Sequence, residues 1–168
     1  MLGLTACAMA RARGAVEVIC VDMNAARLAL AQTFGATRVC APNATAETVK
    51  AATGGYGVDA AVELTGATPA LESGLAQLRI GGTLVLVGAV FLTPAVSLLP
   101  EVLVRRCLTL RGVHNYAPRH LQAAVEFLAA AQTYPFASLV STWHPLESIA
   151  TALEQARANP PLRLGIRP

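Results

Sequence analysis

Residues 16–22 read Val-Glu-Val-Ile-Cys-Val-Asp, a run rich in β-branched side chains that ends in an acid. Asn24 follows as a candidate N-cap, and the next segment repeats apolar side chains at helical spacing up to Phe34. Gly35 is a typical residue for the end of such a helix. This stretch therefore predicts one buried strand followed by one helix.

The same alternation continues along the chain. We expect strands over residues 38–41, 58–64, 83–89, 107–113 and 162–166, a short extended piece over 141–144, and helices over 2–13, 45–53, 69–78, 97–105, 119–131 and 146–158. A capping-box-like Thr45-Ala46-Glu47-Thr48 opens one helix, and Gly81-Gly82 is interpreted as a turn. Alternating strands and helices specify a parallel sheet covered by helices on both faces. No repeat or linker interrupts the pattern, so we predict one α/β domain over residues 1–168.

Composition excludes several classes of function. With 168 residues and 54% hydrophobic content, the chain is long and apolar enough for a core. Its 13 basic and 10 acidic residues are scattered, which argues against a nucleic-acid partner. Residues 80–100 carry no charge, but glycines and prolines punctuate them, so we interpret them as a strand and a loop and expect no membrane span. Leu4-Thr5-Ala6-Cys7 resembles a lipoprotein box, which we reject because no hydrophobic leader precedes it.

The four cysteines, Cys7, Cys20, Cys40 and Cys107, form no C-x-x-C pair and have no histidine at a ligand spacing. We therefore expect no metal site within this chain. Cysteines inside apolar runs are usually small buried hydrophobes, and nothing points to an oxidising compartment. The cytoplasm is the expected location.

Ligands of open parallel sheets bind at the carboxyl ends of the strands. The strand that begins at Val16 ends at Asp22, whose carboxylate can accept both hydroxyls of an adenosine ribose and would repel a 2′-phosphate. Asp22 follows Gly3 by 19 residues, close to the spacing between the last glycine of a dinucleotide motif and its acid. The alternative is an ordinary first-turn acid at a helix N-terminus. We favour NAD over NADP.

Three later strands also end in small or glycine residues that let a flat ring approach the backbone. These ends are Glu63-Leu64-Thr65-Gly66, Val87-Gly88-Ala89 and Gly112-Val113-His114-Asn115. His114 is the one candidate acid or base near them, but it lacks an identifiable partner, so we interpret it as structural and assign no catalytic residue.

Together these residues resemble the medium-chain, zinc-type alcohol dehydrogenases, which are oxidoreductases. The resemblance covers nearly the whole chain and rests on six stretches: Val-Ile-Cys-Val-Asp at 18–22, Ala-Arg-Leu-Ala-Leu-Ala at 26–31, Phe-Gly-Ala-Thr at 34–37, Thr-Gly-Gly-Tyr-Gly-Val-Asp at 53–59, Glu-Leu-Thr-Gly at 63–66 and Gly-Gly-Thr-Leu-Val-Leu-Val-Gly at 81–88. Residues 106–120 further resemble a clade associated with phosphonate catabolism.

The resemblance implies a Rossmann-like, doubly wound parallel sheet that binds NAD. Asp22 matches the ribose-binding acid and Arg27 the basic residue that flanks the adenosine. The end of the pyrophosphate turn matches Leu2 and Gly3. The wall along the nicotinamide matches Val87, Gly88 and Ala89, and the segment beside its carboxamide matches Val113 and His114. Thr65 completes the expected set of cofactor-binding residues.

The resemblance also implies that parts of the family pattern are absent. The zinc ligands belong to an upstream catalytic domain that this chain does not contain. The family's sheet has the strand order 3-2-1-4-5-6, and its first, interior strand has no counterpart here. We therefore expect an incomplete sheet with unpaired edges on both neighbours of the missing strand. Met1 would then be an internal residue of a Gly-x-Gly-Met-Leu-Gly turn, a hypothesis that the upstream reading frame can test.

The resemblance implies reversible oxidation of an alcohol by hydride transfer to NAD, with a small-molecule alcohol or aldehyde as substrate and zinc in the absent domain. This chain would bind the cofactor and be inactive alone. One alternative is an NADPH-dependent quinone-reductase-like enzyme, which Asp22 argues against. Others are a methyltransferase and a catalytically silent fragment that serves in oligomerisation. In the family the strand at about 107–113 pairs across a dimer axis, so a homo-oligomer is expected.

Overall fold

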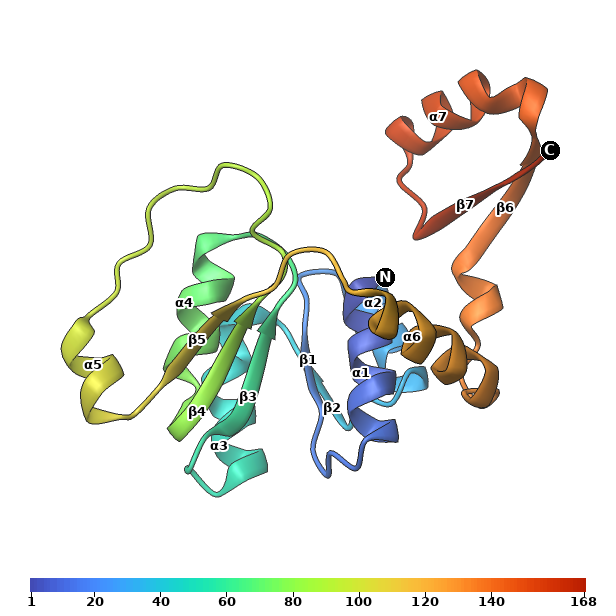
Figure 1. Cartoon of the computed structure of the whole chain (residues 1–168). Helices are drawn as coiled ribbons and strands as arrows, with labels where there is room; N and C mark the ends of the chain where they lie inside the picture. The colour runs from blue at the N-terminus through green and yellow to red at the C-terminus, as the bar shows by residue number, and fades with distance from the viewer.

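A computed structural model describes all residues, 1–168, and has strands and helices in alternation (Figure 1). The strands are β1 (Ile19–Val21), β2 (Arg38–Cys40), β3 (Val58–Glu63), β4 (Leu78–Leu86), β5 (Thr109–Gly112), β6 (Val140–Pro145) and β7 (Arg163–Arg167). The helices are α1 (Leu2–Ala12), α2 (Ala25–Thr33), α3 (Thr45–Thr53), α4 (Thr68–Ala76), α5 (Pro100–Arg105), α6 (Pro118–Ala130) and α7 (Ile149–Ala158). No helix is both long and apolar enough to cross a membrane.

All strand pairs are parallel, and they form three separate sheets: β1-β2, β3-β4-β5 and β6-β7. The members of the first two sheets that lie nearest each other in Figure 1 are β1 and β3, and these strands are not paired. The arrangement is that of a doubly wound sheet in the order 3-2-1-4-5-6 without its strand 1. The predicted Rossmann-like α/β fold with parallel strands is confirmed.

The hydrophobic core is divided in the same way as the sheet. One cluster joins α1, α2 and the segment after α6, where Phe34 is fully buried and its ring meets that of Phe136 edge-on at 5.1 Å between centroids. The other joins α4 to β4 through Leu71, Leu78 and Leu84. Only 17 of 168 residues are buried, so the unpaired edges leave much apolar surface open to solvent.

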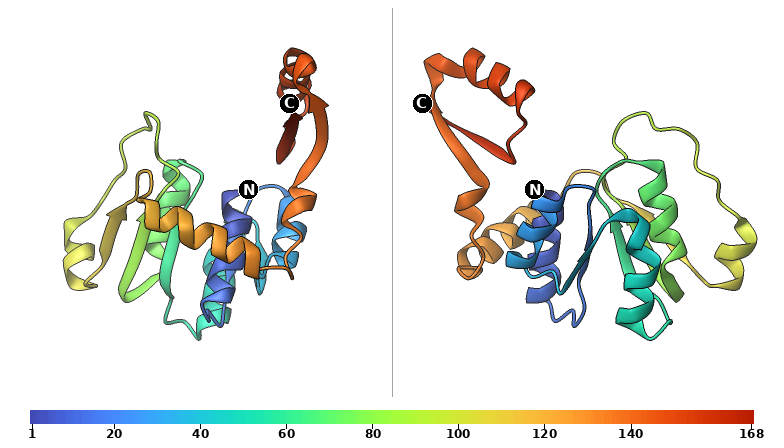
Figure 2. Two further views of the ribbon diagram at one scale, coloured as in Figure 1. Left: turned by 45° about the vertical axis from the view of Figure 1, so that its right-hand side comes forward. Right: turned by 180° about the vertical axis from the view of Figure 1, so that it is seen from behind.

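β6 and β7 pair only with each other, and α7 connects them. Both views in Figure 2 show this unit standing away from the other two sheets. Within this unit the Trp143 ring lies against Gly165, and the Arg167 guanidinium sits 5.1 Å from the centre of that ring. The unit therefore adds no strand to the β1-β2 or β3-β4-β5 sheet.

Three local predictions were wrong. Gly81-Gly82 does not separate a helix from a strand, because β4 already begins at Leu78 and its register with β3 shifts between Val58 and Ala60. The helix predicted from residue 97 begins only at Pro100, whose fixed φ suits the first turn. The capping box at Thr45 does not form; its hydroxyl instead donates to the Pro42 carbonyl at 2.9 Å.

Glu17 connects the segment before β1 to β2. Its carboxylate accepts hydrogen bonds from the Thr37 hydroxyl at 2.6 Å and from the Arg38 guanidinium at 3.3 Å. The hydrogen bond from Thr37 has the larger effect and the one from Arg38 the smaller. Both hold the pKa of Glu17 below its ordinary value of 4.5. The ionised Glu17 carboxylate therefore stabilises the folded chain at pH values above 4.5. This stabilisation is lost as the pH falls through the lowered pKa of Glu17.

We expect Glu17→Gln to lower the free energy of unfolding at pH 7, since the neutral amide loses the ionic contact with Arg38. The difference from the unaltered chain should close as the pH falls below that carboxyl's pKa, as urea titrations between pH 3 and 7 would measure. Glu72→Gln, on an exposed face of α4, is the matched control and should show no such pH dependence. A constant difference at all pH values would contradict the ionic explanation.

Candidate functional site

Asp22 follows β1 directly, at the carboxyl end of the β1-β2 sheet. Its Oδ1 accepts the Asn24 backbone N–H at 2.9 Å, while its Oδ2 lies 3.9 Å from Nη1 of Arg27. The Asp22 side chain is 31% exposed. One carboxylate oxygen is thus held by the backbone, and the other faces Arg27 and solvent.

Asn24 explains why Arg27 lies there. Its side-chain oxygen accepts the Arg27 backbone N–H at 3.1 Å and caps α2, as the sequence predicts. The cap fixes the direction in which α2 leaves β1, and it places the first turn of the helix beside Asp22. The Arg27 side chain remains 55% exposed and available to a ligand.

The amino-terminal end of α1 lies in the same neighbourhood. The first helical bond runs from Thr5 N to Met1 O, so the N–H groups of Leu2, Gly3 and Leu4 have no acceptor inside the helix. Burial lowers the pKa of the Met1 amino group, the charges of Arg27 and Arg163 lower it further, and Asp22 opposes them. Leu2 and Gly3 therefore present free donors close to Asp22 and Arg27.

The ends of β3 and β4 are built around close backbone contacts. A Cβ on Gly88 would lie 2.4 Å from Gly66 N and 2.5 Å from Leu64 C, so only glycine fits there. Gly66 has a φ of +76°, which also favours glycine. Thr65 is held at this turn because its N–H and hydroxyl both donate to Oε1 of Glu63, at 2.5 and 2.6 Å.

The ends of β4 and β5 line an open cavity of about 430 Å³. Its walls are Leu86, Val87, Ala89, Val90, Gly112, Val113 and His114. Four of the predicted residues, Val87, Ala89, Val113 and His114, thus meet at one cavity, with Gly88 in the same turn. The His114 side chain is exposed to solvent at the mouth of this cavity.

The predicted residues fall into two groups on either side of the unpaired β1 and β3 edges. Leu2, Gly3, Asp22 and Arg27 form the first, and none of them lines the cavity of the second. An elongated ligand is needed to contact both groups.

Comparison with known proteins identifies the family of this chain. A model of the zinc-binding dehydrogenases matches residues 2–130. The chain belongs to this family. Sorbitol dehydrogenase of Bacillus subtilis is 32% identical over 92% of the chain and 44% of its own length, and that of Rattus norvegicus is 31% identical over 99% of the chain and 46% of its own length.

Solved structures show the same likeness. An alcohol dehydrogenase from Thermotoga maritima covers 99% of the chain with a TM-score of 0.91 and 27% identity, and the chain covers 47% of it. An alcohol dehydrogenase zinc-binding domain protein from Burkholderia ambifaria has a TM-score of 0.85 and 31% identity, with coverage of 99% and 45%. The zinc-binding dehydrogenase chain therefore spans less than half the length of these relatives.

No three histidine, cysteine, aspartate or glutamate side chains of this dehydrogenase chain lie close enough together to hold a metal ion. Cys7 is buried and Cys20 is half-buried, and the neighbouring Cys20 thiol together with burial raises the pKa of Cys7. Two adjacent thiols with no third donor do not make a zinc site. The metal-ligating side chains of this chain therefore do not fit a zinc ion.

Sequence reasoning missed two features of the site. The first is Glu63, which is 4% exposed and accepts hydrogen bonds from the turn after β3. Its place just before Thr65-Gly66 is the sequence feature that could have predicted this role. Arg163, far along the chain in β7, reaches the amino-terminal end of α1, where its Nε lies 2.9 Å from the Met1 sulfur. No local sequence pattern predicts the contact between Arg163 and Met1.

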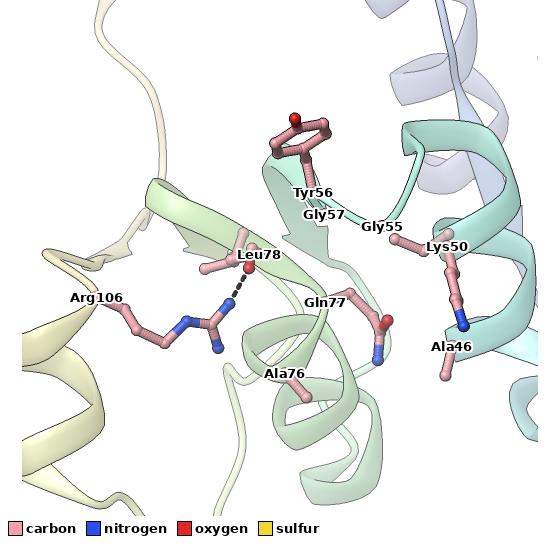
Figure 3. Close-up of a pocket in the computed structure, with 10 residues that line it drawn as sticks. Ala46, Lys50, Gly55, Tyr56, Gly57, Ala76, Gln77, Leu78 and Arg106 are labelled. Carbon is pink, nitrogen blue, oxygen red and sulfur yellow. Dashed lines mark hydrogen bonds between the residues drawn. The ribbon is translucent and has the colours of Figure 1, made fainter.

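A second pocket, of about 230 Å³, lies at the opposite, amino ends of β3 and β4 (Figure 3). Lys50, Tyr56, Gln77 and Arg106 contribute its polar side chains. The Arg106 guanidinium is already engaged by the Leu78 carbonyl, as the dashed line in Figure 3 marks. None of the predicted site residues lies in this pocket.

Proposed function

We propose that this chain is the NAD-binding half of a zinc-dependent alcohol dehydrogenase. The observation that carries the proposal is the position of Asp22, at the end of β1, with one oxygen free beside Arg27 and next to the unsatisfied N–H groups of α1. A carboxylate that ends this strand and accepts the ribose hydroxyls is the feature by which such sheets recognise the adenosine of NAD.

The remaining groups fit the rest of the dinucleotide. The free N–H groups of Leu2 and Gly3, at the positive end of α1, suit the pyrophosphate. The cavity lined by Val87, Ala89, Val113 and His114 suits a flat ring, since most of the residues in its wall are apolar. The negative Asp22 disfavours the additional 2′-phosphate of NADP. These residues bind and orient the cofactor, which supplies the hydride acceptor when bound.

The activity of the whole protein is the reversible oxidation of a small alcohol to an aldehyde or ketone. The zinc-binding donors are expected in a part of the protein outside this chain, and a cytoplasmic homo-oligomer is the expected form. We propose that this chain alone has no dehydrogenase activity. Incubation with NAD and primary and secondary alcohols should give no NADH absorbance above buffer at 340 nm, and any protein-dependent rate would contradict this.

Thermal denaturation with three ligands tests the cofactor assignment. NAD should stabilise the chain by about 2.7 kcal/mol when its concentration is 100-fold above its Kd. NADP at the same concentration should stabilise it less, because its phosphate meets Asp22. Stronger stabilisation by NADP would favour the quinone-reductase-like alternative. Stabilisation by S-adenosylmethionine and not by NAD would favour a methyltransferase.

A further inference from the structure

The pocket at the amino ends of β3 and β4 is separate from the predicted cofactor site. Its volume is about 230 Å³, and its walls come from α3, the turn after α3, the end of α4, the start of β4 and the segment before β5. It shares no lining residue with the cavity at the carboxyl ends of β4 and β5. A ligand of this pocket would therefore contact none of the residues assigned above to NAD.

Hydrogen bonds fix the backbone around the pocket. Thr53 ends α3, and its hydroxyl accepts the Gly57 N–H at 3.0 Å. Val58 N, at the start of β3, donates to Gln77 O at 2.9 Å. These bonds hold the turn after α3 against the end of α4, so the walls of the pocket are in place without a ligand.

Lys50 and Arg106 give the pocket its charge. Figure 3 shows them on opposite sides, Lys50 from α3 and Arg106 from the segment before β5, with Gln77 between them. None of the ten lining residues carries a carboxylate. The ion pairs of the chain engage four other cations, Arg27, Arg38, Arg79 and Arg105. The pocket is thus positively charged at two separate places.

Arg106 is held in position by the surrounding backbone. Its Nη2 donates to the Leu78 carbonyl, and its own carbonyl accepts the Gly81 N–H at 2.8 Å. A guanidinium has five N–H donors in one plane, so donors remain for a ligand. Their planar arrangement matches the oxygens of phosphate and carboxylate groups. A side chain that is already ordered loses less conformational entropy when a ligand binds.

The remaining walls of the pocket are largely apolar. Ala46, Val49, Ala76 and Leu78 contribute aliphatic side chains. Val49 is 5% and Leu78 is 1% exposed, so both belong to the interior of the chain. Pockets for drug-sized ligands have volumes of about 300 to 1,000 Å³, and this pocket is smaller. Its size and lining suit a molecule with a short carbon chain.

We propose that this pocket binds a short organic molecule with an anionic group at each end, of the class of the phosphorylated carboxylic acids. Lys50 and Arg106 lie on opposite sides, so each can bind one of the two anionic groups. The aliphatic walls then contact the carbon atoms between these groups. A molecule with a single anionic group would leave one of the two cations without a partner, and it therefore binds more weakly.

The test titrates the ¹⁵N-labelled full chain, at constant ionic strength, with 3-phosphoglycerate, which has a phosphate at one end and a carboxylate at the other. The amide signals of Tyr56, Gly57 and Gln77 should shift. Glycerol 3-phosphate, which lacks the carboxylate, should bind at least about fivefold more weakly. Equal affinities for the two compounds, or shifts confined to Leu2 and Gly3 in α1, would overturn the proposal.

Lys50→Gln removes one cation from an exposed position, so the chain should remain folded. It should weaken the binding of 3-phosphoglycerate about fivefold and bring it close to that of glycerol 3-phosphate. Arg119→Gln is the matched control, because it removes the same charge from the exposed first turn of α6, and both affinities should stay within about twofold. Equal losses in the two variants would overturn the proposal, since they would show attraction to the overall charge of the chain. No measurement uses NAD, so the outcome is independent of the proposed function.

Discussion

Gly88→Ala is expected to lower the free energy of unfolding by about 3 kcal/mol, at the upper end of the cost of overpacking. The added Cβ would lie 2.4 to 2.5 Å from Gly66 N, Leu64 C and Thr65 N. All three are backbone atoms, so no side chain can rotate away to make room. For a chain of this size the melting temperature should fall by roughly 6 to 12 °C.

Gly112→Ala is the matched control, because it also lies at the end of a strand lining the cavity but has nothing within 4 Å of its Cβ position. We expect that substitution to change the free energy of unfolding by less than about 1 kcal/mol, and to stabilise the chain if it changes it at all. Circular dichroism melts of both variants check the pair. Equal melting temperatures would mean that the β3 and β4 ends are not packed as described.

Asp22→Asn is expected to weaken NAD binding about 10- to 100-fold, because a hydrogen bond to a charged group contributes about 1.5 to 3 kcal/mol. The amide oxygen can still accept the Asn24 N–H, so the β1–α2 turn should keep its shape. The loss of negative charge should also reduce the discrimination against NADP. Isothermal titration of both cofactors measures both effects.

Asp59→Asn is the control for charge alone. Asp59 is an exposed carboxylate that pairs with Arg79 at 2.6 Å, near the amino end of β3. Its substitution should leave NAD affinity within about twofold. A similar loss of affinity in both variants would show that Asp22 acts only through the overall charge of the chain and does not bind the ribose.

The parts of the fold that follow local rules could be predicted from the sequence. Asn24 caps α2 as expected, and β1, β3 and β4 end one to three residues before Asp22, Gly66 and Gly88, where β-branched runs meet glycine or an acid. The extent of β4 could not be predicted, because Gly81-Gly82 resembles a turn locally and only pairing with β3 extends the strand across it. Tertiary pairing overrides the local signal there.

Contacts between segments far apart in the sequence could not be predicted either. The separation of β6 and β7 from the other sheets depends on which strand each one pairs with, and strand patterns do not encode partners. The contact of Arg163 with Met1 joins the two ends of the chain. The buried role of Glu63 depends on the turn that folds over its carboxylate. Such features arise from packing, not from spacing along the sequence.

The most direct test of the central claim maps NAD onto the ¹⁵N-labelled chain by chemical-shift perturbation. The proposal predicts that the perturbed amides are those of Leu2, Gly3, Asp22, Arg27, Gly88 and Val113, along the carboxyl ends of β1, β4 and β5. Perturbations confined to Lys50, Tyr56, Gln77 and Arg106, which line the pocket at the other end of β3 and β4, would contradict it.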